Sequence, residues 1–147
     1  MSPDSSSMLR RVVRGFAAYD LVITLPFLTP WTADWLLRTF REVHLSLSLG
    51  GEPMPAFTLQ HVFFVTLFGV LAVIWALVRI LQPTALHGAI DTAGRVLVST
   101  WMVLALVQGA SQVIGSFLVM EAVGAVVQGV VLWSLRGRAT LAPAPTS

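Results

Sequence analysis

The stretch from Val62 to Val78 contains no charged residue and constrains the fold more than any other part of the sequence. It lies within an apolar run, 59–82, that is long enough to cross a membrane, since a helix rises about 1.5 Å per residue and the hydrocarbon core is about 30 Å thick. Pro83 ends the run, and the residues TALHG that follow it predict a short turn. The run therefore predicts a membrane-spanning helix.

Three further apolar runs have a similar length, and each predicts a spanning helix: 12–30, 88–109 and 113–135. Pro26 and Pro30 are expected to kink or end the first of these spans, because proline removes a helical hydrogen bond and clashes with the preceding turn. Together with 59–82, these runs predict an all-α fold, an integral membrane antiparallel four-helix bundle.

The composition agrees with this architecture. Hydrophobic residues make up 56% of the 147 residues and charged residues only 11%, whereas an ordinary soluble domain is about 25% charged. We expect a single membrane domain over 1–147, with disordered tails at 1–8 and 139–147. Arg10 and Arg11 precede the first span as they would in a signal peptide, but no small-x-small cleavage site follows, so this helix is expected to be retained.

The segment 31–58 connects the first two spans and contains a predicted amphipathic helix at about 32–48. Apolar and charged side chains of this helix occupy opposite faces, with Arg38 and Glu42 four residues apart. The apolar face holds Leu36, Phe40, Val43 and Leu47, and the other face holds Arg38, Arg41 and Glu42. This pattern is typical of a helix that lies on the outer membrane surface or caps the bundle.

The arginines predict the orientation of the chain, because cytoplasmic loops and span ends carry an excess of basic residues. Four spans place both termini and the 83–87 turn on one side. That side or its margin holds Arg10, Arg11, Arg14, Arg79, Arg95, Arg136 and Arg138, and the other side holds Arg38 and Arg41. Both termini are therefore expected in the cytoplasm. The use of arginine without lysine suggests a GC-rich bacterial gene, and hence the bacterial inner membrane.

Three polar residues from different spans lie at a similar depth, about 12 Å from the cytoplasmic face: Asp20, Arg95 and Gln128. An unpaired charge at that depth is costly, so such residues normally face the bundle interior and contact one another. We expect an ion pair between Asp20 and Arg95, with Gln128 adding hydrogen bonds.

A second ion pair is expected between Arg79 and Asp91, which flank the short turn between two spans. Asp91 and Arg95 are also four residues apart on one helix, so this acid could serve either arginine. Glu121 lies about 22 Å from the cytoplasmic face, where no basic residue of another span is expected at its level. It could be reached from the outer segment by Arg38, Arg41 or His61.

These polar residues have two interpretations, a buried network that fixes the packing of the helices or a candidate intramembrane binding site. The sequence identifies no catalytic residue and no cofactor motif such as HExxH or a phosphate-binding loop. Cysteine is absent, which excludes disulfides, thiol nucleophiles and iron–sulfur clusters. We expect no metal role for His44, His61 or His87, which lie near the membrane interfaces on both sides, and no nucleic-acid binding, because the arginines lie at span ends.

Four short spans, an outer segment between the first two and arginine-rich inner margins resemble the small bacterial membrane proteins of the DoxX-like kind, over residues 12–135. Members of that group include subunits associated with quinone-linked sulfur oxidation. The eukaryotic sterol-isomerase-like four-helix proteins are similar in outline, but their characteristic His and Glu positions are not recognisable here.

The sequence favours an accessory or scaffold subunit of a larger membrane assembly, without a catalytic centre of its own, whose partners are lipid and another membrane protein or a second copy. The alternative is a binder or carrier of a small apolar or weakly acidic molecule. In that case a cavity inside the bundle would be lined by Asp20, Arg95, Gln128 and Glu121, whereas a dry interior with Asp20 against Arg95 would favour the subunit.

Overall fold

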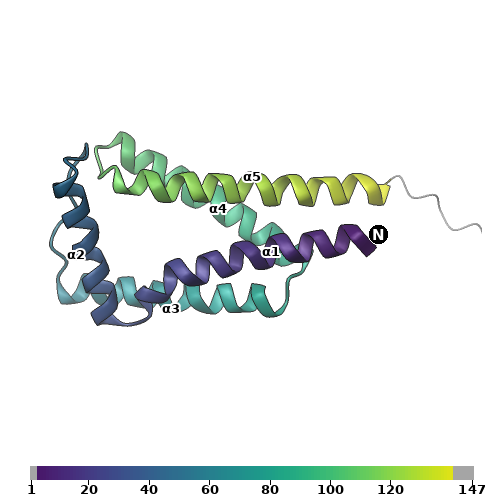
Figure 1. Cartoon of the computed structure of the whole chain (residues 1–147), viewed down its shortest axis with the longest axis horizontal. Helices are drawn as coiled ribbons and strands as arrows, with labels where there is room; N and C mark the ends of the chain where they lie inside the picture. Colours follow the sequence, from purple (N-terminus) through teal and green to yellow (C-terminus); the bar gives the residue numbers. More distant parts are fainter. Residues whose placement is uncertain (1–2, 141–147) are drawn as a thin grey trace, which may run out of the picture.

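The structure, a computed structural model, describes residues 3–140, and its helices confirm the predicted all-α class. The elements follow in the order α1 (Pro3–Thr24), the 3-10 helix η1 (Leu25–Leu28), α2 (Pro30–Ser46), α3 (Leu59–Leu81), α4 (Ala85–Val107) and α5 (Val113–Thr140). Figure 1 shows α1, α3 and α5 running along the molecule, with α2 across one end.

Three helices, α3, α4 and α5, are long and apolar enough to cross a membrane. A fourth crossing is added if α1 and η1 form one broken span with α2, to which they are bent by 105°. These helices have the length and composition of a multi-pass membrane protein, while the closed four-helix bundle stays a prediction.

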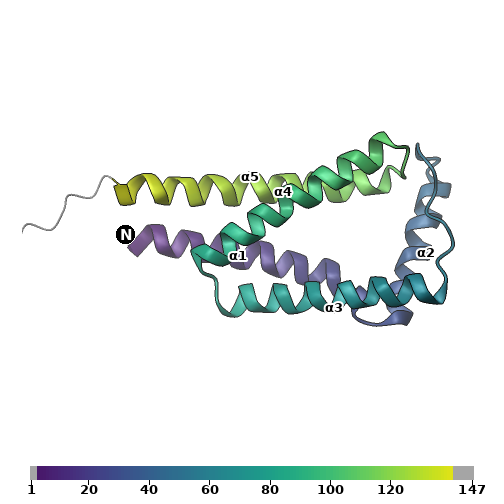
Figure 2. The ribbon, with the colours of Figure 1, turned by 180° about the vertical axis from the view of Figure 1, so that it is seen from behind.

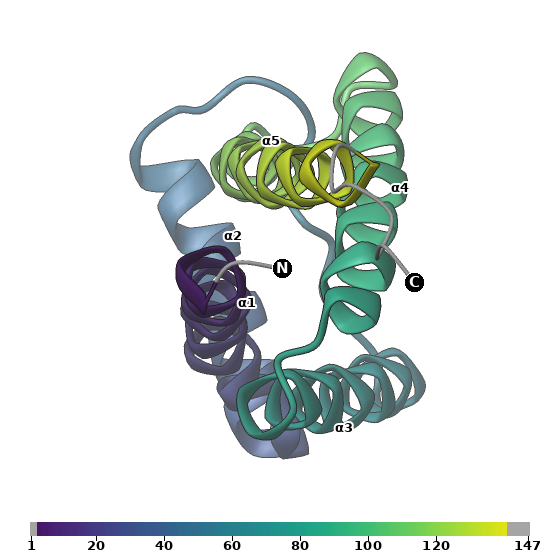
Figure 3. The same ribbon diagram turned by 90° about the vertical axis from the view of Figure 1, so that its right-hand side faces the viewer.

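The four long helices form two pairs, in which α1 packs on α3 and α4 packs on α5 (Figures 2 and 3). The pairs meet near the start of α1, where Leu9 and Val13 pack on Val131 of α5 in an apolar core. From there α3 and α4 diverge toward α2, although they follow each other in the chain (Figure 2). The helices are therefore closely packed at one end and separated at the other.

The helix boundaries follow local sequence signals. Thr58 and Thr84 each precede a helix and accept a hydrogen bond from the backbone N–H three residues later, at the starts of α3 and α4. As expected from the prolines, α1 ends at Thr24, Pro26 lies within η1, and Pro30 is the first residue of α2.

The predicted disorder of the tails is wrong where the structure describes them. Residues 3–8 are the first turns of α1, and residues 139 and 140 end α5. Pro3 suits the first turn of a helix, because the backbone N–H that proline lacks needs no partner within the helix there. The rest of both predicted tails lies outside the described residues.

Helix α2 packs through a face that differs from the predicted one. Its buried residues are Ala33, Leu37 and His44, whereas Val43 and Leu47 are 38% and 65% exposed. Its charged pair is also different, because the Arg38 Nε donates to Asp34 at 2.9 Å rather than to Glu42. His44 fixes the far end of α2 on the turn between α4 and α5, where its Nδ1 lies 2.7 Å from the Ser111 hydroxyl.

The loop after α2 is held to the same turn by backbone contacts. The Glu52 N–H donates to the Gly109 carbonyl at 2.7 Å, and the Gln112 N–H donates to the Gly50 carbonyl at 3.1 Å. The segment between α2 and α3 thus ties the first helix pair to the second at the end where the pairs are separated.

Candidate functional site

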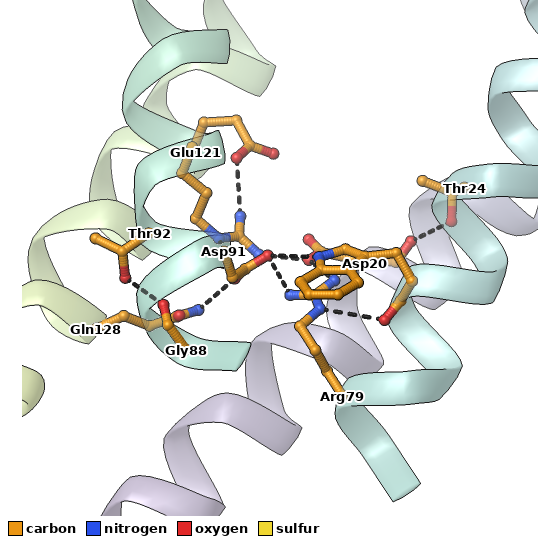
Figure 4. A network of polar contacts seen from close by, with 10 residues as sticks. Asp20, Thr24, Arg79, Gly88, Asp91, Thr92, Glu121 and Gln128 are labelled. Atoms are coloured by element: carbon orange, nitrogen blue, oxygen red, sulfur yellow. Dashed lines mark hydrogen bonds and ion pairs between the residues drawn. The ribbon is translucent and has the colours of Figure 1, made fainter. Parts of the chain in front are cut away.

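Five ionisable side chains from four helices form one network of ion pairs (Figure 4). The members are Asp20 of α1, Arg79 of α3, Asp91 and Arg95 of α4, and Glu121 of α5. Three carboxyl groups therefore share two guanidinium groups. The sequence prediction named all five residues but joined only four of them, in two pairs in which Asp91 could serve either arginine, and left Glu121 without a partner in the spans.

Arg95 is the centre of the network. Its Nη2 donates to Asp20, its Nε donates to Asp91 at 3.0 Å and its Nη1 donates to Glu121 at 2.9 Å. Its side chain is only 3% exposed, and its guanidinium carbon lies 5.2 Å from the centre of the Phe16 ring. The structure thus contains the Asp20–Arg95 contact expected from the depth of the two residues, together with two further carboxylate contacts.

Arg79, which belongs to the other helix pair, contacts two of these three acids. Its Nη2 donates to Asp20 at 2.7 Å, and its Nη1 lies 2.6 Å from Asp91, which is the second expected pair. Asp91 therefore contacts both arginines, so the two alternatives left open by the sequence both occur. Contact between Asp20 and Arg79 was not expected. It links α1 to α3, whereas the contact with Arg95 links α1 to α4.

Gln128 has a different partner from the one expected. Its Nε2 donates to Asp91 at 2.9 Å, and it makes no hydrogen bond to Asp20 or Arg95. Its Oε1 is buried without a hydrogen-bond partner among the described residues. Trp75 also donates to Asp91, from its Nε1 at 3.3 Å. Asp91 is therefore the acid with the most donors, and Gln128 orients this acid from the side of α5.

The expectation that Glu121 lacks a basic partner in the spans is wrong. The expected depths refer to the start of α4 and the end of α5, although the two helices are joined by a tight turn at their other ends. Counted from this turn, Arg95 is twelve residues before Val107 and Gly124 is eleven after Val113, which places them side by side. Glu121 is one helical turn nearer to this turn than Gly124, within reach of the long arginine side chain.

Gly124 makes this reach possible. A Cβ at this position would lie 3.0 Å from Cδ and 3.1 Å from Nε and Nη1 of Arg95. The absent side chain therefore leaves room for the guanidinium between α4 and α5. Register counted from the turn, together with a glycine opposite the arginine, is the sequence signal that would have identified the Glu121 contact.

A cavity of about 340 Å³ lies beside the network, between the two helix pairs. Asp20, Glu121 and both arginines line it, together with aromatic and aliphatic side chains of all four long helices, whereas Gln128 does not. The arginine side chains are almost completely buried, but those of Asp20 and Glu121 are 16% and 23% exposed. The network thus forms a polar patch in the wall of a cavity that is otherwise mainly apolar.

None of the three histidines is among the residues that line this cavity, and His44 contacts Ser111 at the turn between α4 and α5. His61 forms a reciprocal cap with Thr58 at the start of α3, and the Nδ1 of His87 lies against the Gln82 carbonyl. Over residues 3–140, no group of three or more His, Asp or Glu side chains has an arrangement that could hold a metal ion.

Comparisons with protein-family models, with curated proteins and with solved structures found no match for the chain. The geometry of the site is therefore the basis for a function. Chemically, the site offers carboxylate acceptors at the edge of an apolar space, which suits binding of a molecule that carries one polar group.

Proposed function

We propose that this multi-pass membrane protein binds a small molecule with an apolar body and one polar group in the cavity between its two helix pairs. The observation that carries the proposal is the position of Asp20, Arg95 and Glu121 in the cavity wall. A network that served only to hold the helices together would not need to border open space. The direct Asp20–Arg95 contact means that the same network also supports the packing of the helices.

The size and lining of the cavity support this proposal. Sites for small molecules have volumes of about 300–1,000 Å³, with mainly apolar walls and a few polar groups that orient the ligand. The cavity lies at the lower end of this range. Its position among helices with the length of membrane spans suits a ligand that reaches it through the lipid.

The proposed location is the bacterial inner membrane, with both termini in the cytoplasm. The start of α1, the α3–α4 turn and the end of α5 lie at one end of the molecule and α2 at the other, which supports this topology (Figure 1). Arg79 and Arg95 no longer count as boundary charges, because both are buried in ion pairs. The remaining arginines, five against two, still favour the end that carries the termini.

An accessory subunit of a membrane assembly is the second candidate. The observation that favours it is the separation of α3 from α4, because a helix of another protein could pack there. The architectural resemblance to the DoxX-like proteins points in the same direction. In this case, the cavity would be part of a protein interface.

Native mass spectrometry of the protein, gently extracted from membranes, separates the two candidates. Gly94 lines the cavity, and a Cβ at this position would have no atom within 4 Å, so Gly94→Leu is expected to occupy part of the cavity. Gly115 has equally open surroundings but does not line this cavity, so Gly115→Leu is the matched control.

A small molecule retained by the wild type and Gly115→Leu but lost from Gly94→Leu is expected. Retention by Gly94→Leu as well would contradict binding in this cavity. A stoichiometric second polypeptide, without a small molecule, would instead support the accessory subunit.

A further inference from the structure

We infer that the cavity selects organic cations, specifically amphipathic amines, whose ammonium group binds at Asp20 and Glu121. This inference rests on the proposed function and adds the chemical class of the ligand. It depends on the charge balance of the network, on the oxygen atoms that remain without a hydrogen bond, and on the aromatic side chains in the same cavity.

The network contains an excess of acid. Asp20, Asp91 and Glu121 face only Arg79 and Arg95, so the formal charges of the five groups sum to one negative charge. A charge in the interior of a membrane protein is costly without a partner. A ligand with one positive charge would balance the network, whereas an anionic ligand would double its excess.

The hydrogen-bond geometry leads to the same class of ligand. All three nitrogen atoms of Arg95 donate to carboxylates, and the Nη2 of Arg79 donates to Asp20. The Nη1 of Arg79 lies 2.6 Å from Asp91 but makes no hydrogen bond in the described part of the chain. The side chains of Arg79 and Arg95 are only 2% and 3% exposed, whereas those of Asp20 and Glu121 are 16% and 23% exposed. The surface that the network offers to a ligand is therefore mainly carboxylate rather than guanidinium.

The acids nearest the open space keep free acceptors. Both arginines donate to the Oδ2 of Asp20, and Arg95 donates to the Oε2 of Glu121. In the described part of the chain, no hydrogen bond is made to the Oδ1 of Asp20 or to the Oε1 of Glu121. Figure 4 shows the second carboxylate oxygen of Glu121 turned away from the dashed contact. These two oxygens can accept hydrogen bonds from an ammonium group.

The rest of the cavity suits an organic cation better than a metal ion. Tyr19 and Phe117 line it beside the acids, and the faces of aromatic rings attract ammonium groups. Aliphatic side chains that could contact the apolar body of the ligand complete the wall: Ile23, Ala72, Ile90 and Val98. An apolar wall of this kind would offer no ligands to a hydrated inorganic cation.

The test compares three probes that share one alkyl chain: octylamine, octanol and octanoate at pH 7. Each is titrated into the full-length protein in neutral detergent, and binding is measured by calorimetry. Binding in the cavity is defined as the part that Gly94→Leu abolishes and Gly115→Leu retains, which removes partitioning into micelles. We expect octylamine to bind at least tenfold more tightly than octanol, with octanoate the weakest.

A second variant tests the role of the charge. Glu121→Gln keeps the shape of the side chain and balances the network at two acids and two arginines. We expect it to reduce the preference for octylamine over octanol at least fivefold, while binding of octanol in the cavity is retained. The comparison of the three probes on the wild type needs no variant of the network, so a misfolded Glu121→Gln protein would not prevent the test.

The outcomes separate the ligand class from the proposed function. Binding of octanol or octanoate in the cavity at least as tightly as octylamine would overturn the cation inference and leave the proposed function standing. Absence of any binding that depends on Gly94 would overturn both. An unchanged preference for octylamine in a folded Glu121→Gln variant would also overturn the inference.

Discussion

At the scale of single residues, Asp20 raises the main question, because a carboxylate within an apolar helix is costly unless it is paired. In the structure, Arg79 and Arg95, from two other helices, both donate to the Oδ2 of Asp20. The arginine fork is suited to this arrangement, since its nitrogen atoms can bind several carboxylates at once. The acids of the network therefore share their donors, so the loss of one arginine affects more than one carboxylate.

Replacement of Arg95 by methionine is expected to be strongly destabilising. Arg95→Met leaves Asp20 and Asp91 with Arg79 as their arginine and removes the arginine partner of Glu121. Loss of one partner from a buried ion pair costs about 3–5 kcal/mol. Arg95→Lys should lie between this variant and the wild type, because lysine supplies the charge without the fork. Unfolding in detergent measures all three proteins.

The matched control is Arg38→Met. Arg38 forms an ion pair with Asp34 on α2, but its side chain is 74% exposed, so we expect a change below about 1 kcal/mol. Equal losses for Arg38→Met and Arg95→Met would show that the buried network does not stabilise the fold.

A double-mutant cycle on Asp20 and Arg95 tests their contact directly. Asp20→Ala leaves Arg95 with two acids and Arg95→Ala leaves Asp20 with Arg79 alone, so the double variant should lose less stability than the sum of the two single losses. Residues in one ion-pair network typically show coupling of about 0.5–3 kcal/mol. Additive losses in the melting of the three variants would exclude a direct interaction.

At the scale of elements, one glycine sets how closely the 3-10 helix η1 can pack on α3. A Cβ on Gly69 of α3 would lie 2.3 Å from the Phe27 carbonyl oxygen of η1, and backbone cannot move away as a flexible side chain can. Together with Pro26 and Pro30, this close approach fixes the place where the chain turns from α1 into α2. The 3-10 helix η1 therefore packs directly against α3.

Gly69→Ala is expected to destabilise the protein although alanine is the better helix former. The added methyl group forces η1 away from α3, and overpacking of this kind costs about 1–3 kcal/mol. Gly94→Ala is the matched control, since a Cβ there meets open space and alanine gains up to about 1 kcal/mol of helix propensity. Thermal melting in detergent should move in opposite directions for the two variants. A higher melting temperature for Gly69→Ala would show that the close approach is not required.

Much of the candidate site was predictable from the sequence, because few polar residues occur in the apolar helices. The depth of each residue along its helix predicted contacts of Asp20 with Arg95 and of Arg79 with Asp91. Both contacts are present. Depth alone missed Glu121, since it neglects the length of an arginine side chain and the register imposed by a tight turn. It also gave Gln128 the wrong partner, because residues at one level on different helices need not face each other.

At the scale of the whole molecule, hydropathy predicted which segments form the long helices but not how these helices pack. In lipid, apolar side chains face the membrane as readily as each other, so the apolar pattern contains little information on helix neighbours. The divergence of α3 from α4, and the cavity beside it, therefore could not be predicted. The packed face of α2 was missed for a related reason, since His44 is buried by a partner distant in sequence, Ser111.

The topology of the whole chain gives the last prediction. The sequence contains no cysteine, so single cysteines can be introduced without background. In intact bacterial cells, a membrane-impermeant maleimide should label Ser46→Cys at the exposed end of α2. It should label Ser2→Cys and Ser147→Cys, near the two chain ends, only after lysis. This result is expected because five arginines lie near the ends of the chain and only two, Arg38 and Arg41, lie on α2, and the side with more arginines is normally cytoplasmic.

The reverse labelling pattern would contradict the orientation predicted from the five arginines near the chain ends. Labelling of the two chain ends on opposite sides would instead mean an odd number of crossings. The three helices α3, α4 and α5 would then span the membrane without α1. In that case Asp20 would not lie on a spanning helix, and its contacts with Arg79 and Arg95 would join a surface helix to the spans.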